Sequence, residues 1–287
     1  MSIVWLNGEL LDEHEATVPA LDRGVLWGYG LFETMRAYGG AVWAFDEHYD
    51  RLCAGGEVIG LDVPDADTVA RSLGDVLVAN DLVDAGVRVT ITAGAGPPDP
   101  QSDAEGPSNI LATAWPLRDY TELYASGAAL VTIPGGGRPL AGVKTTSYAV
   151  SVAGRHIARN AGGDDALFVD GDGHVLEATG SNLFVARDGR LITPPLTEAV
   201  LPGVTRRHVL RVASDAGFET AEEPLHVDDL FAADDVVLTS SLREVYPARS
   251  VDGRPLQVRD TAEKLRKAYR TAVLADLSSP RRRASTG

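Results

Sequence analysis

The segment GVRVTITAGAG, residues 86–96, constrains the fold more than any other stretch of the chain. Successive side chains of a β-strand point to opposite faces, so Arg88 and Thr90 share one face while Val87 and Val89 share the other. The alternation therefore predicts a strand with one apolar face and one polar face. A core can cover the first, and the second stays available for polar work.

Strands and helices are mixed along both halves of the chain. Acidic starts followed by apolar residues at three- and four-residue spacing predict helices at residues 46–60 and 65–81. Strands are predicted at residues 2–10, 41–45, 86–96, 110–117 and 128–134, and further helices at 147–160, 204–218 and 261–277. The turns DGDG and RDGR predict hairpin-like strands between the helices at 147–160 and 204–218.

Two domains are expected for a chain of 287 residues. We predict a smaller N-terminal α/β domain at residues 1–119, a linker at 120–125, and a larger C-terminal domain at 126–287 that carries Lys144. A proline-rich loop at residues 93–109 separates two predicted strands, and long loops of this kind are often functional.

The charge of the chain argues against nucleic acid as a partner. Its formal net charge is −15, and its basic residues are scattered among acids rather than clustered, except in the tail at residues 279–287. Cys53 is the only cysteine, and the six histidines never fall at metal-ligand spacing with it or with one another. We therefore expect no disulfide and no metal.

The apolar segments of the chain are short. None approaches the roughly 20 residues that span a bilayer, and the first ten residues lack the basic and apolar regions of a secretion signal. The sequence thus predicts a cytoplasmic protein without a membrane partner.

Lys144 stands out within LAGVKTTSYAV, residues 140–150. It lies between a predicted strand and a predicted helix, and its neighbours are small or carry hydroxyl groups. Most lysines are solvated surface charges, but a buried lysine has a lowered pKa and can act as a Schiff-base nucleophile or a general base. This position makes Lys144 the first candidate for a catalytic residue.

Two other segments look suited to a charged ligand. Glu177 interrupts an apolar strand, and a buried carboxylate needs an arginine or another cationic partner, such as the protonated ring nitrogen of a pyridine cofactor. Residues 203–205 open a predicted helix, where backbone N–H groups and the helix dipole favour an anion such as phosphate. Residues 239–241 add a hydroxyl-rich turn at a strand end.

Six segments carry a resemblance to a known family, in the same order and with similar gaps. They are DRGVLWGYGLFETMR, EHYDRL, VKTTSYA, EATGSNLF, LPGVTR and TSSLREVYP. With them the chain resembles the class IV aminotransferases, the pyridoxal-phosphate enzymes of fold type IV. The resemblance implies a two-domain α+β/α/β fold like that of D-amino-acid aminotransferase, with the cofactor at the domain interface, and a homodimer.

The resemblance also implies roles for individual residues. Lys144 would form the Schiff base with pyridoxal 5'-phosphate and act as the catalytic acid and base. Glu177 would face the pyridine nitrogen, Tyr148 would reach the phenolic oxygen, and Leu201 would pack on the ring. The residues implied to surround the phosphate are Arg51, Gly203, Val204, Thr205, Ser240 and Ser241.

The substrate residues suggested by the resemblance are Phe32, Thr34, Arg36 and Arg88, of which the two arginines would hold carboxylate groups. Branched-chain enzymes usually have glycine at the position of Thr34, whereas aminodeoxychorismate lyases have threonine there. The loop at residues 93–106 lacks both the lyase arginine near Pro98 and the R-x-H pair of the familiar D-amino-acid enzymes.

We favour a transaminase that acts on D-amino acids, with (R)-amines as further substrates, over two alternatives. The nearest is 4-amino-4-deoxychorismate lyase, which should want two well-placed cations for its dicarboxylate. The next is a branched-chain L-amino acid aminotransferase. A binding module without catalysis would require an exposed Lys144 and no bound cofactor.

Overall fold

The computed structural model describes residues 2–135, 140–196 and 199–278, which form two compact units. Unit 1 comprises residues 1–118 and 143–148, and unit 2 comprises 119–142 and 149–287. The basic tail at 279–287 and most of the glycine-rich turn before Leu140 lie outside the described residues. No helix within the described ranges has the length and hydropathy needed to cross a membrane.

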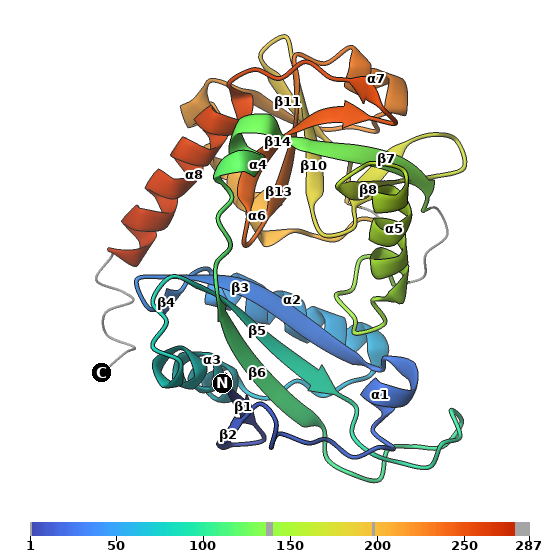
Figure 1. The fold of residues 1–287 in the computed structure, drawn as a ribbon, viewed down its shortest axis with the longest axis vertical. Helices are drawn as coiled ribbons and strands as arrows, with labels where there is room; N and C mark the ends of the chain where they lie inside the picture. Colours follow the sequence, from blue (N-terminus) through green and yellow to red (C-terminus); the bar gives the residue numbers. More distant parts are fainter. Residues whose placement is uncertain (1, 136–139, 197–198, 279–287) are drawn as a thin grey trace. The chain divides into compact units, whose positions relative to one another are not determined.

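Unit 1 is built on an antiparallel sheet of six strands in the order β2-β1-β6-β5-β3-β4 (Figure 1). The strands are β1 (Ile3–Leu6), β2 (Glu9–Asp12), β3 (Gly30–Tyr38), β4 (Ala41–Val42), β5 (Ala85–Thr92) and β6 (Asn109–Pro116). Three helices belong to the same unit: α1 (Arg23–Trp27), α2 (Phe45–Ile59) and α3 (Ala66–Ala79).

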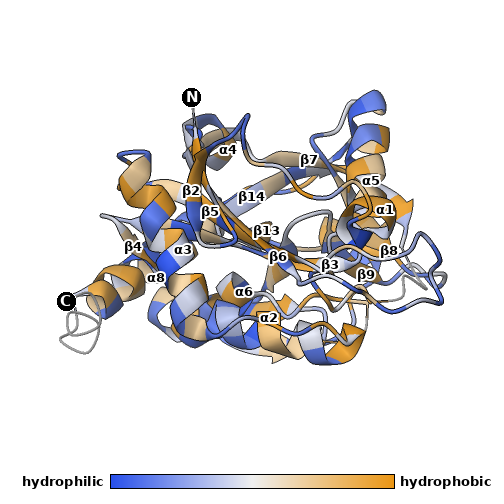
Figure 2. Ribbon diagram, turned by 90° about the horizontal axis from the view of Figure 1, so that it is seen from below, coloured by the Kyte–Doolittle hydropathy of each residue, from blue (hydrophilic) through white to orange (hydrophobic). Residues whose placement is uncertain are grey.

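Helices α2 and α3 pack on the apolar face of this sheet. Val87, Val89 and Ile91 of β5 are fully buried there against Leu52 of α2 and Leu73 of α3. Both helices carry hydrophilic and hydrophobic residues in alternating patches along their length, as Figure 2 shows. The predicted polar face of β5 is therefore the face that these helices leave uncovered.

Unit 2 contains a mixed sheet of nine strands in the order β12-β11-β10-β13-β14-β7-β8-β9, with β15 paired to β14. Its strands are β7 (Ala128–Pro134), β8 (Asp165–Val169), β9 (Val175–Ala178), β10 (Asn182–Arg187), β11 (Arg190–Thr193), β12 (Glu219–Glu222), β13 (Asp235–Ser240), β14 (Glu244–Val251) and β15 (Arg254–Pro255). Its helices are α4 (Thr121–Ser126), α5 (Ala149–Asn160), α6 (Val204–Val212), the 3-10 helix η1 (Ser214–Ala216), α7 (Val227–Phe231) and α8 (Thr261–Leu277).

The mixture of sheets and helices in two units confirms the predicted fold class, and differences are local. The segment at residues 2–10 folds as a hairpin rather than one strand, because Asn7 and Gly8 have φ angles of 52° and 104° that turn the chain. Only Ala41–Val42 of the strand predicted at 41–45 is a strand. The segment taken as a linker contains helix α4.

Lys144 belongs to unit 1, whereas the sequence placed it with the C-terminal domain. The reason is a non-local pairing: the chain returns for residues 143–148 and bonds to the edge of β3. The backbone N–H of Phe32 donates to the Lys144 carbonyl at 3.0 Å, and that of Thr146 donates to the Gly30 carbonyl at 2.9 Å. Sequence separation of more than 100 residues hides such a contact from local patterns.

Candidate active site

The backbone on both sides of Lys144 is fixed on unit 1. Thr145 forms a bridge with Leu31, and the Thr146 hydroxyl donates to the Gly28 carbonyl at 2.7 Å. Gly30 leaves room for this segment, since a Cβ there would lie 3.0 Å from the Thr146 hydroxyl and 2.4 Å from the Ile91 carbonyl. The half-buried Lys144 side chain therefore starts from a rigid position.

The four predicted substrate residues come together on one face of the unit 1 sheet. Thr34 of β3 lies directly opposite Arg88 of β5 in the antiparallel register, so their side chains share a face. Phe32 and Arg36 are two residues to either side of Thr34 and point the same way. This is the face that α2 and α3 do not cover.

The ring of Phe32 is the centre of this face. The Arg88 guanidinium carbon lies 3.6 Å from the ring centroid, and Lys144 Nζ lies 4.4 Å from it. Tyr148 meets the same ring edge-on, with centroids 5.4 Å apart. Phe32 is 3% exposed, so two cations rest against a buried aromatic surface and can attract a carboxylate.

Burial lowers the pKa of Arg88, and the opposing effects of Tyr148 and Glu33 do not restore it. A guanidinium nevertheless keeps its charge at neutral pH. Arg88 Nε donates to the Thr90 hydroxyl at 3.2 Å, which orients the group along the strand. Arg36 lies over the ring of its neighbour Tyr38, 4.6 Å from the centroid.

The opposite face of the same sheet holds Arg51 in a buried ion-pair network. Arg51 Nε and Nη2 each donate to one oxygen of Glu33 at 2.7 Å, and His48 Nδ1 lies 2.7 Å from Glu33 Oε2. The structure thus places the predicted phosphate ligand Arg51 as a fork gripped by a carboxylate that is 1% exposed.

Charges in this network shift the pKa of both its titratable members. Burial alone would raise the pKa of Glu33, but Arg51 and then His48 outweigh burial and hold that pKa far below its ordinary value. Burial lowers the pKa of His48, and Arg51 and Lys144 act in the same direction against Glu33. Glu33 is therefore ionised and His48 is neutral near pH 7.

Sequence reasoning missed Glu33, although a signal was present. Glu33 lies between Phe32 and Thr34 in the quoted segment FETMR, at a position whose strand neighbours on the same face, Leu31 and Met35, are apolar. An acid in an apolar row needs a cation. The period of the strand therefore pointed to a buried pair, and Arg51 was the available partner.

In unit 2, the predicted cofactor residues Glu177 and Leu201 are brought together. Glu177 lies on β9 and is 8% exposed. The Leu201 backbone N–H donates to Glu177 Oε2 at 3.1 Å. A side chain that sequence reasoning missed, Asn182, donates from Nδ2 to the same oxygen at 3.3 Å and to the Leu201 carbonyl at 2.9 Å.

Helix α6 begins at Val204, after the N-cap Gly203, which offers no side-chain cap for the first turn. A Cβ at Gly203 would lie 1.9 Å from Asn182 Oδ1, so the turn has room for glycine alone. The buried Thr205 hydroxyl has no hydrogen-bond partner among the described residues. Uncapped N–H groups and an unsatisfied hydroxyl are the features of an anion site.

The hydroxyl-rich turn after β13 supplies further groups of the same kind. The buried Thr239 hydroxyl also lacks a partner within the described part of the chain. Ser240 and Ser241 are partly buried, and the Ser240 hydroxyl accepts from the Arg243 N–H at 3.4 Å. Helix α6 packs against β13, so these groups fit a phosphate in chemistry and placement within unit 2.

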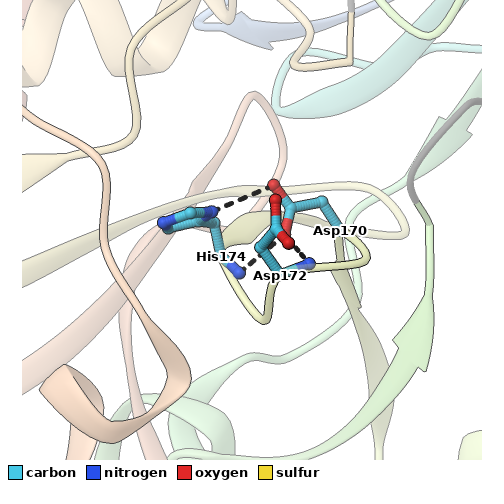
Figure 3. A group of neighbouring side chains, drawn as sticks. All are labelled: Asp170, Asp172 and His174. Carbon is cyan, nitrogen blue, oxygen red and sulfur yellow. Dashed lines mark hydrogen bonds and ion pairs between the residues drawn. The ribbon is translucent and has the colours of Figure 1, made fainter.

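One acidic turn of unit 2 has the composition of a cation site. Asp170, Asp172 and His174 lie in the hairpin between β8 and β9, with ligand atoms within 4.8 Å of one another (Figure 3). Asp170 accepts from the N–H groups of Asp172 and His174, at 3.0 and 2.8 Å, and from the imidazole at 3.1 Å. These bonds account for the group as a turn.

Comparison with known proteins gives consistent matches. Residues 30–251 match the family model described as amino-transferase class IV. The chain is 34% identical to a provisionally named branched-chain-amino-acid aminotransferase of Methanocaldococcus jannaschii, covering 93% of this chain and 95% of that one. It is 30% identical to D-alanine aminotransferase of Bacillus licheniformis, covering 88% and 89%.

Solved structures match both units. The branched-chain aminotransferase of the archaeon Thermoproteus uzoniensis, solved with norvaline, is similar with a TM-score of 0.86 and 30% sequence identity. That match covers 96% of this chain and 95% of the other. Further similar branched-chain amino acid aminotransferases were solved with pyridoxamine 5'-phosphate and with N-(5'-phosphopyridoxyl)-L-glutamate.

Proposed function

Because the chain belongs to the class IV aminotransferases and is a pyridoxal-phosphate-dependent enzyme, we propose that it transfers the amino group of aliphatic amino acids, foremost branched-chain L-amino acids, to 2-keto acids. The observation that carries this proposal is the Phe32 ring, which holds Arg88 and Lys144 on its surface. An apolar ring beside a cation and an amine suits an apolar amino acid with one carboxylate.

D-amino acids remain the second candidate. Sequence reasoning placed them first, chiefly because the loop at residues 93–106 lacks basic residues and Thr34 replaces a glycine usual in branched-chain enzymes. The D-alanine aminotransferase of Bacillus licheniformis favours this alternative, whereas the names of the other relatives favour branched-chain substrates. The preference for D-amino acids is thus still a prediction.

The residues of unit 1 have roles that follow from their contacts. When bound, pyridoxal phosphate supplies an aldehyde and an electron-withdrawing ring that stabilises a carbanion. Lys144 Nζ would attach to the cofactor and then carry the proton that leaves the substrate α-carbon. Arg88 would hold the substrate carboxylate, and Tyr148 would donate to the phenolic oxygen. Arg51 would contribute charge toward the phosphate from its fixed position on Glu33.

The residues of unit 2 would hold the other parts of the cofactor. Glu177 carries a buried carboxylate that can keep the ring nitrogen protonated, while Leu201 offers an apolar side chain to the ring. The phosphate ligands proposed here are Gly203, Val204, Thr205, Ser240 and Ser241. The unsatisfied Thr205 hydroxyl is the part of this assignment with direct structural support.

We also propose that the enzyme works as a homodimer. Leu21, Val25 and Leu26 in and before α1 are exposed, and Val25 is 60% exposed. A second copy of the chain would cover apolar side chains of this kind.

The substrate class can be tested by half-reaction spectroscopy with L-leucine, D-alanine and aminodeoxychorismate. We expect L-leucine to bleach the absorbance of the covalently bound cofactor, at roughly 400 nm for this type of enzyme. Bleaching by D-alanine but not L-leucine would replace the first candidate with the second. Formation of p-aminobenzoate and pyruvate would contradict both in favour of the lyase.

Replacing Arg88 with leucine is expected to lower kcat/KM for leucine by roughly 10- to 100-fold, the value of one charge-assisted hydrogen bond. Isoamylamine is leucine without its carboxylate, and its half-reaction should change little in the same variant. Arg36→Leu is the matched control, since Arg36 lies two residues beyond Thr34 on the same face. Equal losses for leucine and isoamylamine would remove Arg88 from the carboxylate role.

A further inference from the structure

We infer that Asn182 is a positioning residue that fixes the Glu177 carboxylate and joins it to the turn before α6. This inference rests on the proposed function, in which Glu177 pairs with the cofactor ring nitrogen and the start of α6 receives the phosphate. One amide would then set the relative position of the two groups that grip opposite ends of the cofactor.

The hydrogen bonds around Asn182 form a closed triangle. Asn182 Nδ2 donates to Glu177 Oε2 at 3.3 Å and to the Leu201 carbonyl at 2.9 Å. The Leu201 N–H donates back to Glu177 Oε2 at 3.1 Å. Since each of the three groups is tied to the other two, the carboxylate cannot rotate without breaking a bond to the turn at residues 201–203.

The type of residue suits the task. The Glu177 carboxylate is buried, and burial of a charge requires hydrogen bonds to it. A lysine or arginine at position 182 would supply them but would also pair with the carboxylate and compete with a ring nitrogen for its charge. A neutral amide orients the carboxylate and leaves its negative charge to act on the cofactor.

The other side of the amide faces the helix start. Asn182 Oδ1 would lie 1.9 Å from a Cβ at position 203, so the amide oxygen packs directly against the N-cap glycine of α6. On the neighbouring strand, Thr239 is directly opposite Asn182, and its buried hydroxyl lacks a partner among the described residues. Asn182 thus contacts or adjoins each element of unit 2 proposed to hold the cofactor.

A purely structural role predicts a different pattern of damage. Asn182 is 6% exposed at the first position of β10, so its replacement would lower stability in either case. A structural defect weakens every cofactor alike. Loss of carboxylate positioning weakens only a cofactor that has a ring nitrogen for Glu177 to pair with.

The test compares two cofactors on the full-length protein after removal of its own. One is pyridoxal 5'-phosphate, and the other is 1-deazapyridoxal 5'-phosphate, in which carbon replaces the ring nitrogen. Dissociation constants are measured for wild type, Asn182→Leu and Asn182→Ser, the last in case the leucine variant does not fold. Thr193→Val is the matched control, because it removes a buried hydrogen bond to the Leu183 carbonyl in the same sheet.

We expect wild type and Thr193→Val to prefer the nitrogen-containing cofactor by roughly 10-fold or more. In the Asn182 variants this preference should shrink toward one, because affinity for pyridoxal phosphate falls while affinity for the deaza cofactor changes little. Equal losses for both cofactors would overturn the role of Asn182 alone. A wild type that binds both equally would overturn the role of Glu177, and this inference with it.

Discussion

Replacing Lys144 with alanine is expected to lower transamination by about 10⁴-fold or more, because one amine attaches the cofactor and moves the proton. The covalent absorbance band should disappear with it. The variant should still bind pyridoxal phosphate without covalent attachment, since the groups at the start of α6 and Glu177 are unchanged. Absorbance spectra and treatment with borohydride, which traps the covalent form only, make the measurement.

Lys267→Ala serves as the matched control for this variant. Lys267 is an exposed lysine of α8 in unit 2, and its removal should change neither the band nor the rate. If Lys144→Ala kept both the covalent band and a measurable rate, another amine would hold the cofactor. The assignment of the active site to the Phe32 face would then be wrong.

Replacing Glu33 with alanine is expected to cost about 3–5 kcal/mol of stability, because Arg51 would be left as a buried charge without its carboxylate. Denaturation followed by tryptophan fluorescence isolates this effect. The four tryptophans, Trp5, Trp27, Trp43 and Trp115, all lie in unit 1. Their signal therefore reports the unfolding of unit 1 rather than of the whole chain.

Two further variants separate pairing from packing. Glu13→Ala removes an exposed acid of unit 1 whose histidine pair should be worth at most about 1 kcal/mol. Glu33→Leu combined with Arg51→Leu should be more stable than Glu33→Leu alone, since no charge is stranded. A loss below about 1 kcal/mol in Glu33→Ala would show that Arg51 finds other compensation.

The same pair makes stability depend on pH in a defined direction. The folded protein holds the pKa of Glu33 below its ordinary value of 4.5. The contribution of ionised Glu33 is therefore complete above pH 4.5 and diminishes as the pH falls below it. Wild type and Glu33→Gln should differ most in stability near neutral pH and converge in acid.

Local patterns carried most of the fold. The alternation in β5 and the helical spacing of α2, α3 and α8 depend on neighbours in sequence, and the structure confirms those elements. The hairpin at residues 2–10 was missed, although its Asn-Gly pair is a turn signal. Lys144 joined the wrong domain in the prediction because its pairing with Phe32 crosses more than 100 residues.

The site shows the same division between local and distant information. Phe32, Thr34, Arg36 and Arg88 were predicted through family resemblance and come together on one sheet face. Glu33 and Asn182 lay inside quoted segments but were not recognised, because their partners Arg51 and Leu201 lie 18 and 19 residues away. Substrate handedness depends on how small groups are arranged in space, which no local pattern encodes.

The chain leaves unit 1 after residue 118, returns for residues 143–148, and departs again. A nascent chain that stops at residue 118 therefore exposes unpaired backbone groups of β3 at Gly30 and Phe32, an edge open to stray association. The segment that later seals this edge is the one that delivers the reactive amine. During synthesis, protection from aggregation and the gain of chemical competence would thus arrive in a single event.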